Sequence, residues 1–329
     1  MTDEIVVSIC CITYNHGKYI GDALEGFINQ KTSFKYEVLI HDDASTDDTA
    51  DIIKAYEKKY PNIIKPILQT ENQYSKHILI NNTFNFPRAK GKYIAICEGD
   101  DYWQDICKLE KQVHYMNSND DCTFCFSNAI VRDERHKEKE HIFVVRNENN
   151  ENLFNKEKLD VGDVAELGFL PTASYLLRRD VFDKLPSYYD TPCPGGDLKM
   201  ALYFTAFGYA HFIDEPMTVY RSNVPGSSLD RWSQYNREQR REHHNKFLTM
   251  IDNVDYLTDY KFSSGLDAAR KPHYRGILMA AESREILADL IYKNYYDKMR
   301  LKDRVQFWCE LIIPEHLIIK IKNIKNHRL

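Results

Sequence analysis

The chain of 329 residues lacks any run of roughly 18 apolar residues, the length that a membrane-spanning helix needs. It also lacks an excess of basic charge, because its formal net charge is −5, and this argues against a dedicated nucleic-acid-binding protein. The first residues, Met1–Glu4, are acidic and lead straight into a strand-like run, so we expect no signal peptide and a cytoplasmic location. The whole chain, 43% hydrophobic and 28% charged, has the composition of a globular protein.

The eight cysteines do not show the pattern of a disulfide framework or a zinc site. Five of them lie in strand-like apolar runs, where free cysteine behaves as a small hydrophobe: Cys10, Cys11, Cys97, Cys122 and Cys125. Cys122 and Cys125 have C-x-x-C spacing without a second pair, and residues three apart on a strand point to opposite faces. We therefore expect no zinc.

Apolar runs and amphipathic helical patterns alternate through the first hundred residues. In chain order they lie at residues 5–12 (strand), 20–28 (helix), 36–40 (strand), 52–56 (helix), 63–68 (strand) and 93–97 (strand). This alternation predicts a doubly wound α/β sheet with right-handed crossovers.

Polar clusters follow three of these strands, at residues 13–17, 41–48 and 98–103. Ligands bind outside the carboxyl ends of strands in open α/β sheets, so we expect the three clusters to converge on one rim. The chain around Glu98, Asp100 and Asp101 is the centre of this prediction, because carboxylates so close together repel one another unless a cation or a proton lies between them. Oxygen ligands suit Mg²⁺, Mn²⁺ or Ca²⁺. The alternative is that Asp100 or Asp101 caps a helix running through Val113.

Beyond residue 103 the pattern becomes less regular. We expect strands at 123–131, 173–177 and 217–221, a helix at 198–206, and helical texture without sheet signals from 232 to 250 and from 274 to 308. The charged segment 132–158 reads as a solvated loop or as a hairpin. These signals predict two domains, residues 1–225 and a helical region 226–329.

The C-terminal tail combines apolar and basic residues. Apolar residues at 308–313 and 317–319 precede Lys320, Lys322 and Lys325. The pattern is that of a peripheral anchor at the inner face of a membrane. The alternative is a terminal helix packed on its own domain, which Pro314 favours because proline disrupts a helix.

Five short segments together resemble the family 2 glycosyltransferases of the GT-A fold. Residues 7–16 resemble the family's opening strand and turn, and residues 39–47 its D-D-x-S-x-D motif. Residues 89–103 are similar to its D-x-D region. Gly195-Gly196-Asp197 before a helix, followed by residues 219–221, matches a later signature. Each motif is short, but their order and their places at strand ends and helix starts make the resemblance specific.

The resemblance implies a nucleotide diphosphate-sugar donor, with UDP as the expected nucleotide, and Mn²⁺ or Mg²⁺ as cofactor. The expected metal ligands are Asp100, Glu98 and Asn223. Asp197 is the expected catalytic base, which takes a proton from an acceptor hydroxyl, and a single displacement then inverts the anomeric centre. A helix N-cap is the alternative role for Asp197. The residues expected to bind nucleotide or sugar are Thr13, Tyr14, Asn15, Asp42, Asp43, Arg88, Glu98, Asp101 and Trp103.

Two departures from the family's pattern affect the expected metal site. Asn223 stands where many relatives carry histidine after the Tyr-Arg pair, and asparagine is a poorer ligand for Mn²⁺. Glu98 replaces the usual aspartate. For Arg88, a surface salt bridge is an open alternative to a phosphate contact.

The implied activity is transfer of one sugar to a glycan or lipid-linked acceptor during synthesis of a surface polysaccharide such as capsule or lipopolysaccharide. A dehydrogenase is excluded because no G-x-G-x-x-G follows the first strand. A sugar-1-phosphate nucleotidyltransferase would need a Gly-rich basic loop there. The remaining alternative is a catalytically inactive relative that binds glycan or nucleotide as a scaffold.

Overall fold

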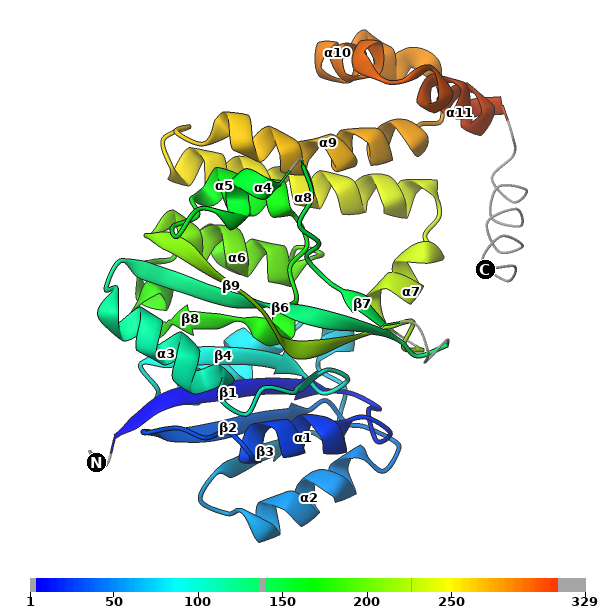
Figure 1. The fold of residues 1–329 in the computed structure, drawn as a ribbon. Coiled ribbons are helices and arrows are strands. Elements are labelled where there is room, and N and C mark those ends of the chain that lie inside the picture. The colour runs from blue at the N-terminus through cyan, green and yellow to red at the C-terminus, as the bar shows by residue number, and fades with distance from the viewer. Residues whose placement is uncertain (1–3, 136–139, 149, 226, 313–329) are drawn as a thin grey trace. The chain divides into compact units, whose positions relative to one another are not determined.

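The computed structural model describes residues 4–135, 140–148, 150–225 and 227–312 of the chain (Figure 1). The described residues form two compact units, which are treated separately below. The first unit comprises residues within 1–192 and 200–224, and the second comprises residues within 193–199 and 225–329.

Four parallel strands form one half of the sheet of the first unit. They are β1 (Ile5–Thr13), β2 (Lys35–Asp42), β3 (Ile64–Leu68) and β4 (Tyr93–Glu98), in the order β3-β2-β1-β4. The centres of β1, β2 and β4 are almost completely buried, as strands covered on both faces require, whereas β3 is mostly half-buried. All four predicted strands are confirmed, and so is the α/β class.

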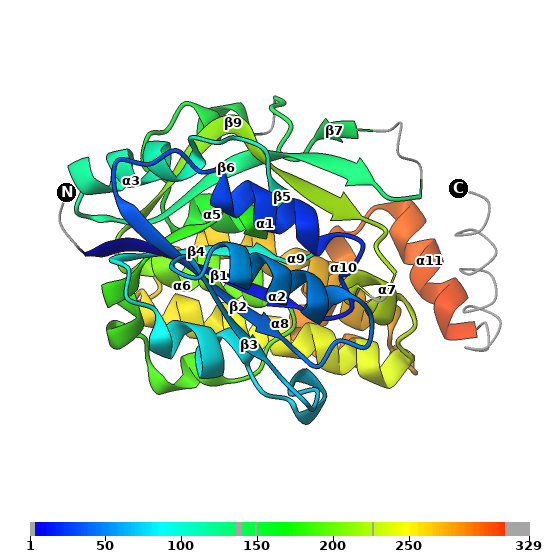
Figure 2. The same cartoon turned by 90° about the horizontal axis from the view of Figure 1, so that it is seen from below.

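Helices between the strands bury an apolar face against this half of the sheet. They are α1 (Ile20–Ile28), α2 (Thr49–Lys59) and α3 (Lys108–Ser118). Figure 2 shows α1 and α2 lying over β1, β2 and β3. Leu24, Phe27, Ile53 and Val113 from these helices share one core with the strands, so each connection returns to the sheet through apolar contacts.

The other half of the sheet is mixed. It contains β5 (Tyr102–Trp103), β6 (Cys122–Asp133), β7 (Glu140–Ile142), β8 (Leu176–Arg178) and β9 (Tyr209–Ser222). The sheet continues from β4 through β8, β6 and β9 to β5, while β7 pairs with the outer end of β6 as a hairpin. This mixed sheet with flanking helices agrees with the GT-A architecture that the resemblance implies.

Three predictions for the irregular region are corrected by the structure. The strand predicted at 173–177 begins only at Leu176, because Thr172–Ser174 form a 3-10 turn. The strand predicted at 217–221 is the end of the much longer β9, whose register against β6 shifts at Ser127 and Asn128. The N-cap alternative for Asp100 and Asp101 is wrong, because α3 starts at Lys108 and β5 lies between.

Shorter elements complete the first unit. They are η1 (Tyr74–Lys76), η2 (Asn81–Asn85), η3 (Phe86–Arg88), α4 (Glu151–Phe154), α5 (Val161–Leu167), η4 (Thr172–Ser174), η5 (Arg179–Lys184) and η6 (Ser187–Asp190). Helix α6 (Gly196–Ala206) begins among residues of the second unit and ends among residues of the first.

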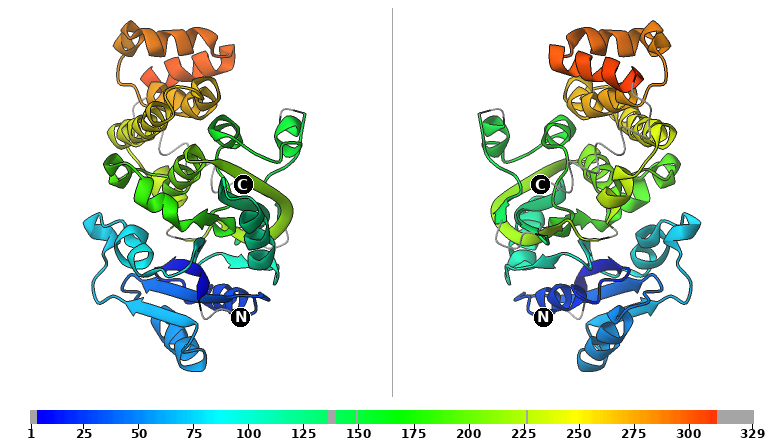
Figure 3. Two further views of the ribbon diagram at one scale, coloured as in Figure 1. Left: turned by 90° about the vertical axis from the view of Figure 1, so that its left-hand side faces the viewer. Right: turned by 90° about the vertical axis from the view of Figure 1, so that its right-hand side faces the viewer.

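The second unit is helical apart from its loops. It contains α7 (Ser228–Ser233), α8 (Arg237–Leu257), α9 (Ser263–Met279), η7 (Arg284–Ala288), α10 (Leu290–Lys298) and α11 (Leu301–Ile312). Helices α8 and α9 lie side by side, as do α10 and α11, drawn in orange in Figure 3. The predicted helix at 232–250 is displaced, because Asn236 caps α8 through Gln239. The predicted membrane anchor falls largely on residues 313–329, outside the described residues.

Candidate active site

The ends of β1, β2 and β4 meet at one rim of the sheet of the first unit. In the parallel registers, Thr13 pairs with Asp42, and Ile12 pairs with Glu98. The Gly99 amide also donates to the carbonyl oxygen of Ile12 over 2.9 Å. The predicted convergence of the three strand ends is therefore confirmed for these segments.

Gly99 allows the acidic segment to pass close to Thr13. A Cβ atom on residue 99 would lie 2.6 Å from Thr13 Oγ1, closer than non-bonded atoms pack. Thr13 Oγ1 is buried and has no hydrogen-bond partner within the described part of the chain. An unpaired buried hydroxyl is costly, so its presence at the rim fits a site that a polar ligand completes.

Asp101 is buried at the turn between β4 and β5. Its Oδ1 accepts a hydrogen bond from the Arg221 amide over 2.8 Å. Burial, followed by the negative charges of Asp100 and Glu98, raises the pKa of Asp101 well above its ordinary value. The segment therefore concentrates more negative charge than it can hold in the absence of a proton or a cation.

Asp100 is the more accessible carboxylate, with 21% of its side chain exposed. His16, in the loop between β1 and α1, places Nδ1 3.8 Å from Asp100 Oδ1. That distance is too long for a hydrogen bond, and the buried His16 Nδ1 has no other hydrogen-bond partner among the described residues. In the sequence His16 is only part of a polar turn, and nothing local there points to this contact.

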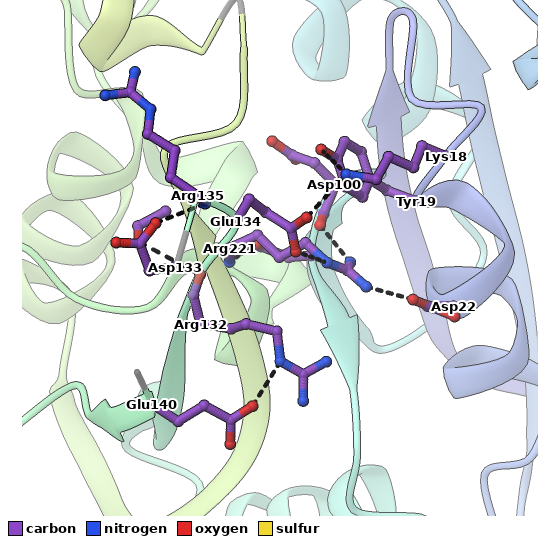
Figure 4. Close-up of polar contacts among 12 residues, drawn as sticks. Lys18, Tyr19, Asp22, Asp100, Arg132, Asp133, Glu134, Arg135, Glu140 and Arg221 are labelled. Carbon is purple, nitrogen blue, oxygen red and sulfur yellow. Dashed lines mark hydrogen bonds and ion pairs between the residues drawn. The ribbon is translucent and has the colours of Figure 1, made fainter. Parts of the chain in front are cut away.

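Arg221, at the end of β9, joins the acidic segment to α1 (Figure 4). Its Nη1 donates to the main-chain oxygen of Asp100 over 2.6 Å, and its Nη2 donates to Asp22 Oδ2. The guanidinium also lies over the rings of Tyr19 and Tyr102, with 5.1 and 4.6 Å to the ring centres. Only 4% of the Arg221 side chain is exposed, so its donors are used within the protein, where they fix the main chain of Asp100.

Glu134 completes this polar network from the segment after β6. Its Oε1 lies 3.3 Å from Arg221 Nε, and its Oε2 accepts a hydrogen bond from Lys18 Nζ over 3.1 Å. Lys18 belongs to the loop after β1. The network therefore links the loop after β1, the acidic segment and the ends of β6 and β9, and sequence reasoning missed it because no motif contains Glu134.

Asp42, the last residue of β2, and Asp43, which follows it, have different partners. Asp42 accepts hydrogen bonds from the Ser45 hydroxyl and amide, and burial raises its pKa. Asp43 accepts from the amides of Gln73 and Tyr74 over 2.8 and 3.0 Å. Asp43 therefore holds the loop after β3 against the rim.

The turn after β1 is held by hydrogen bonds to the segment that follows β2. Asn15, in the left-handed conformation at φ 56°, accepts a hydrogen bond at Oδ1 from the Thr46 amide over 2.8 Å. The main-chain N–H of Asn15 donates to Ser45 Oγ over 2.8 Å. Tyr14 is exposed beside it, so Tyr14 presents an aromatic ring while Asn15 shapes the loop.

Arg88 and Trp103 have structural partners that the sequence did not reveal. Arg88 donates to the main-chain oxygens of Lys65 and Ile40 over 2.9 and 3.0 Å, so it braces β2 against β3 instead of forming a surface salt bridge. Trp103 is buried, packs edge-on against Phe27, and donates from Nε1 to the Ala173 oxygen over 2.7 Å. We leave both side chains out of the proposed donor site for these reasons.

Asn223 lies just beyond Arg221, in the left-handed conformation at φ 60°. Its side-chain amide donates to Asp133 Oδ1 over 3.0 Å. The Asn223 side chain therefore links the segment after β9 to the end of β6. Its role as a metal ligand stays a prediction.

Asp197 lies in the first turn of α6, among residues of the second unit. Gly195 before it has φ 74°, and a Cβ there would lie 2.5 Å from Phe247 Cζ, so the turn leading to Asp197 requires glycine. Asp197 follows the first residue of the helix, Gly196, and is not its N-cap. Burial raises the pKa of the Asp197 carboxyl, which suits a proton acceptor better than an ordinary aspartate.

The donor set at the rim has the chemistry of a Mg²⁺ or Mn²⁺ site. Asp100 and Glu98 offer hard carboxylate oxygens, and the raised pKa of the neighbouring Asp101 shows that the segment favours a proton or a cation. Within the described ranges, however, no group of three or more His, Cys, Asp or Glu side chains is arranged to hold a metal. Mg²⁺ in nucleotide enzymes commonly takes one or two carboxylates and completes its shell with phosphate oxygens and water, and this rim fits that arrangement.

Comparison with known proteins gives a family match. The model of the family described as glycosyl transferase family 2 matches residues 8–185, which include the rim but end before Asp197 and Arg221. A protein of Mycobacterium tuberculosis is 35% identical over 223 residues, 67% of this chain and 60% of the relative. The chain thus spans less than two thirds of that relative's length. The putative teichuronic acid biosynthesis glycosyltransferase TuaG of Bacillus subtilis is 34% identical over 122 residues, 37% of this chain and 46% of TuaG.

Two solved structures share the fold. TarS 1–349 of S. aureus in complex with UDP-GlcNAc has a TM-score of 0.56 at 14% identity, covering 93% of this chain and 80% of TarS 1–349. The mannosyltransferase PcManGT of Pyrobaculum calidifontis, in complex with GDP-Man and Mn²⁺, has a TM-score of 0.51 at 17% identity, covering 98% and 88%. At these identities the likeness is one of fold.

Proposed function

The chain belongs to glycosyl transferase family 2, and we propose that it transfers a sugar from a nucleotide diphosphate-sugar to a hydroxyl of a glycan or lipid-linked acceptor. The observation that carries this proposal is the meeting of Thr13, Asp42 and the acidic segment around Asp100 at one rim. Such a rim offers acceptors for a nucleotide base and ribose beside oxygen ligands for a cation. The residues proposed to contact the donor are Thr13, Tyr14, Asn15, Asp42, Asp43, Glu98 and Asp101.

Asp100 and Glu98 are proposed to hold Mn²⁺ or Mg²⁺. The bound cation would offset the negative charge that develops on the leaving diphosphate. Arg221 would support this site by fixing the main chain of Asp100, and His16 Nδ1 lies 3.8 Å from the Asp100 carboxylate. The Mn²⁺ in the PcManGT complex supports this part of the proposal by analogy of fold.

Asp197 is proposed as the base. The acceptor oxygen bonds to the anomeric carbon while the bond from that carbon to the diphosphate oxygen breaks, and Asp197 takes the hydroxyl proton. One displacement inverts the anomeric centre. The raised pKa of Asp197 supports this role, because a stronger base accepts the proton more readily.

The wider assignment also remains a proposal. Residues 1–225 would form the donor-binding and catalytic domain, and residues 226–329 a helical region on the acceptor or membrane side. UDP is the favoured nucleotide, with the TarS complex in support. The likeness to TuaG, which is named for teichuronic acid biosynthesis, supports a proposed role in surface polysaccharide synthesis. A cytoplasmic location at the inner face of the membrane is part of the same proposal.

Thermal unfolding with and without Mn²⁺ tests the donor site. A ligand at about 100 times its Kd stabilises the folded state by about 2.7 kcal/mol, so UDP with Mn²⁺ should raise the melting temperature of the wild-type chain. Asp100→Asn should remove the Mn²⁺-dependent part of this rise. Asp51→Asn, which changes an exposed carboxylate on α2, is the matched control and should behave as wild type. An unchanged Mn²⁺-dependent rise in the Asp100 variant would contradict the metal role.

A further inference from the structure

We propose that one face of α11 contacts the surface of a lipid bilayer that contains anionic headgroups. Leu301, Val305, Trp308 and Ile312 are 77%, 53%, 39% and 78% exposed. Their spacings of four, three and four residues place them on the same face of the helix. These four residues are called the α11 stripe below.

The α11 stripe is not needed to hold α11 in its own unit. A different face of the helix supplies Phe307, which is fully buried in a small core with Leu278, Ala281 and Met299. On that face Asp303 is also buried, and it accepts hydrogen bonds from Arg300 and Arg275 over 3.0 and 3.2 Å. The helix is therefore anchored by one face and presents a second apolar face to solvent.

Exposed apolar side chains are concentrated in this helical pair. Of the fourteen large hydrophobic side chains that are exposed among the described residues, six belong to α10 and α11, including Leu290 and Ile291 at the start of α10. Single exposed hydrophobic residues scattered over a surface need no explanation, whereas a cluster of them marks an interaction surface. This concentration makes α10 and α11 the best candidate for such a surface.

The aromatic residue in the stripe has the features of an interfacial side chain. Trp308 is partly exposed, and its indole Nε1 donates to the hydroxyl of Tyr296 on α10 over 2.8 Å. Tryptophan and tyrosine collect at membrane–water boundaries because they combine an apolar ring with one polar group. Since its indole N–H already has a partner, Trp308 can bury the rest of its ring without leaving a polar group unpaired.

The charges near the stripe favour a lipid surface over a second copy of this chain. Arg300 and Lys302 are exposed at the start of α11. Outside the described residues, the sequence that follows is also basic, with Lys320, Lys322, Lys325 and Arg328 against the single acidic residue Glu315. Basic residues are attracted to an anionic leaflet, whereas two copies meeting through the same face would bring like charges together.

A surface contact is the mode of membrane binding that fits these helices. Among the helices described, none combines the length and apolar character required to cross a bilayer. An amphipathic helix lying in the headgroup region buries only its apolar face. Helix α11 is already folded and is anchored through Phe307 to Leu278, Ala281 and Met299, so membrane contact would not require the entropy cost of forming a helix.

Co-sedimentation of the full chain with phospholipid vesicles tests the proposal, and it does not depend on sugar transfer. The test variant is Leu301→Ser, Val305→Ser and Ile312→Ser, because these side chains are exposed and their loss should leave the fold intact. The matched control is Ile142→Ser with Val145→Ser, exposed apolar residues of the first unit. Wild type and control should bind vesicles of phosphatidylcholine with phosphatidylglycerol, and bind pure phosphatidylcholine more weakly.

The partition coefficient of the stripe variant on anionic vesicles should be at least roughly tenfold lower than that of wild type, because three apolar side chains no longer become buried in lipid. Equal partitioning of the stripe variant and wild type would overturn the proposal, and so would absence of wild-type binding. Light scattering after size exclusion tests self-association as the alternative role of the stripe. A dimeric wild type with a monomeric stripe variant would assign this face to self-association and would overturn the membrane proposal.

Discussion

The guanidinium of Arg221 donates from Nη1 to the main-chain oxygen of Asp100 over 2.6 Å, across 121 residues of sequence. The amide of the same arginine donates to Asp101 Oδ1. One residue at the end of β9 therefore sets the position of both carboxylates that follow β4. Because its side chain is almost completely buried, we interpret Arg221 as a positioning residue that fixes the geometry of the acidic segment.

Arg221→Lys should fold and keep its charge, but lose the two-pronged contact to Asp100 and Asp22, because lysine has a single donor group. A displacement of about 1 Å at a reacting group costs on the order of 10²-fold in rate, so we expect transfer to fall by about that factor. The Mn²⁺ concentration needed for half-maximal UDP binding should rise as well. Calorimetric titration of UDP at several Mn²⁺ concentrations measures this directly.

The matched control for Arg221 is Arg270→Lys in the second unit. Arg270 is likewise buried and bonds Asp255 and Asp252 over 2.6 and 3.0 Å. This variant should lose stability without altering the Mn²⁺ dependence. If both lysine variants shift the Mn²⁺ dependence equally, Arg221 has no special effect on the metal ligands.

Gly99→Ala should impair donor binding, because the new Cβ would meet Thr13 Oγ1 at 2.6 Å and force the acidic segment or β1 to move. We expect at least about tenfold weaker UDP binding in Mn²⁺, a loss of about 1.4 kcal/mol. Gly21→Ala on α1 is the control: nothing lies within 4 Å of its Cβ. Alanine favours a helix over glycine by about 0.5–1 kcal/mol, so this variant should gain stability and bind normally.

Asp197→Asn should bind UDP-sugar and Mn²⁺ as wild type does but lose transfer by about 10²–10⁴-fold, the usual contribution of a general base. The control Asp120→Asn changes an exposed carboxylate of the first unit and should stay active. An active Asp197 variant would rule out the base assignment. A wild-type chain that binds donor without any turnover would instead favour the scaffold alternative.

The pH dependence of transfer gives a second readout for Asp197. A base works only when deprotonated, and burial raises the pKa of Asp197 above 3.8. The rate should therefore fall on the acidic side through a pKa higher than that of an ordinary aspartate. An acidic limb at or below 3.8 would contradict the assignment.

The stability of the second unit should depend on a histidine pair. His244 Nδ1 on α8 and His273 Nδ1 on α9 lie 3.1 Å apart, and one of them must stay neutral to accept the hydrogen bond. Burial, with the charges of His243 and Arg240, lowers the pKa of His244 to about 4. Burial, followed by His244 and His243, lowers the pKa of His273 to about 3.

Both folded-state pKa values lie below the ordinary 6.5, so between those limits the unfolded chain binds more protons than the folded chain. Stability should be fully present above about pH 6.5 and decline as the pH falls toward 4. In urea unfolding, His273→Gln should flatten this decline, because glutamine does not titrate. The control His114→Gln, an exposed position on α3, should keep the wild-type slope.

The local pattern of the first hundred residues was sufficient to predict much of the fold. The strands at Ile5, Tyr36 and Tyr93 are largely apolar runs that end in polar clusters, so short-range sequence contained their type and their approximate limits. Their parallel order then requires Thr13, Asp42 and Glu98 to share one rim. For β8 and the long β9 the sequence predicted a strand but not its limits, because pairing with β6 decides where each begins and ends.

The sequence by itself determined which chemistry is present: carboxylates after buried strands, a glycine between them, and an apolar, basic C-terminal region. Only the tertiary structure decided which of these side chains act together. Arg221 meets Asp100 because β9 pairs with β5, the strand that follows the acidic segment, and Glu134 meets Arg221 from the end of β6. Trp103 and Arg88 turn into the protein and donate to main-chain oxygens. Hydrogen bonds between residues so far apart in sequence depend on how the elements pack. The local sequence pattern around each residue does not reveal its distant partner.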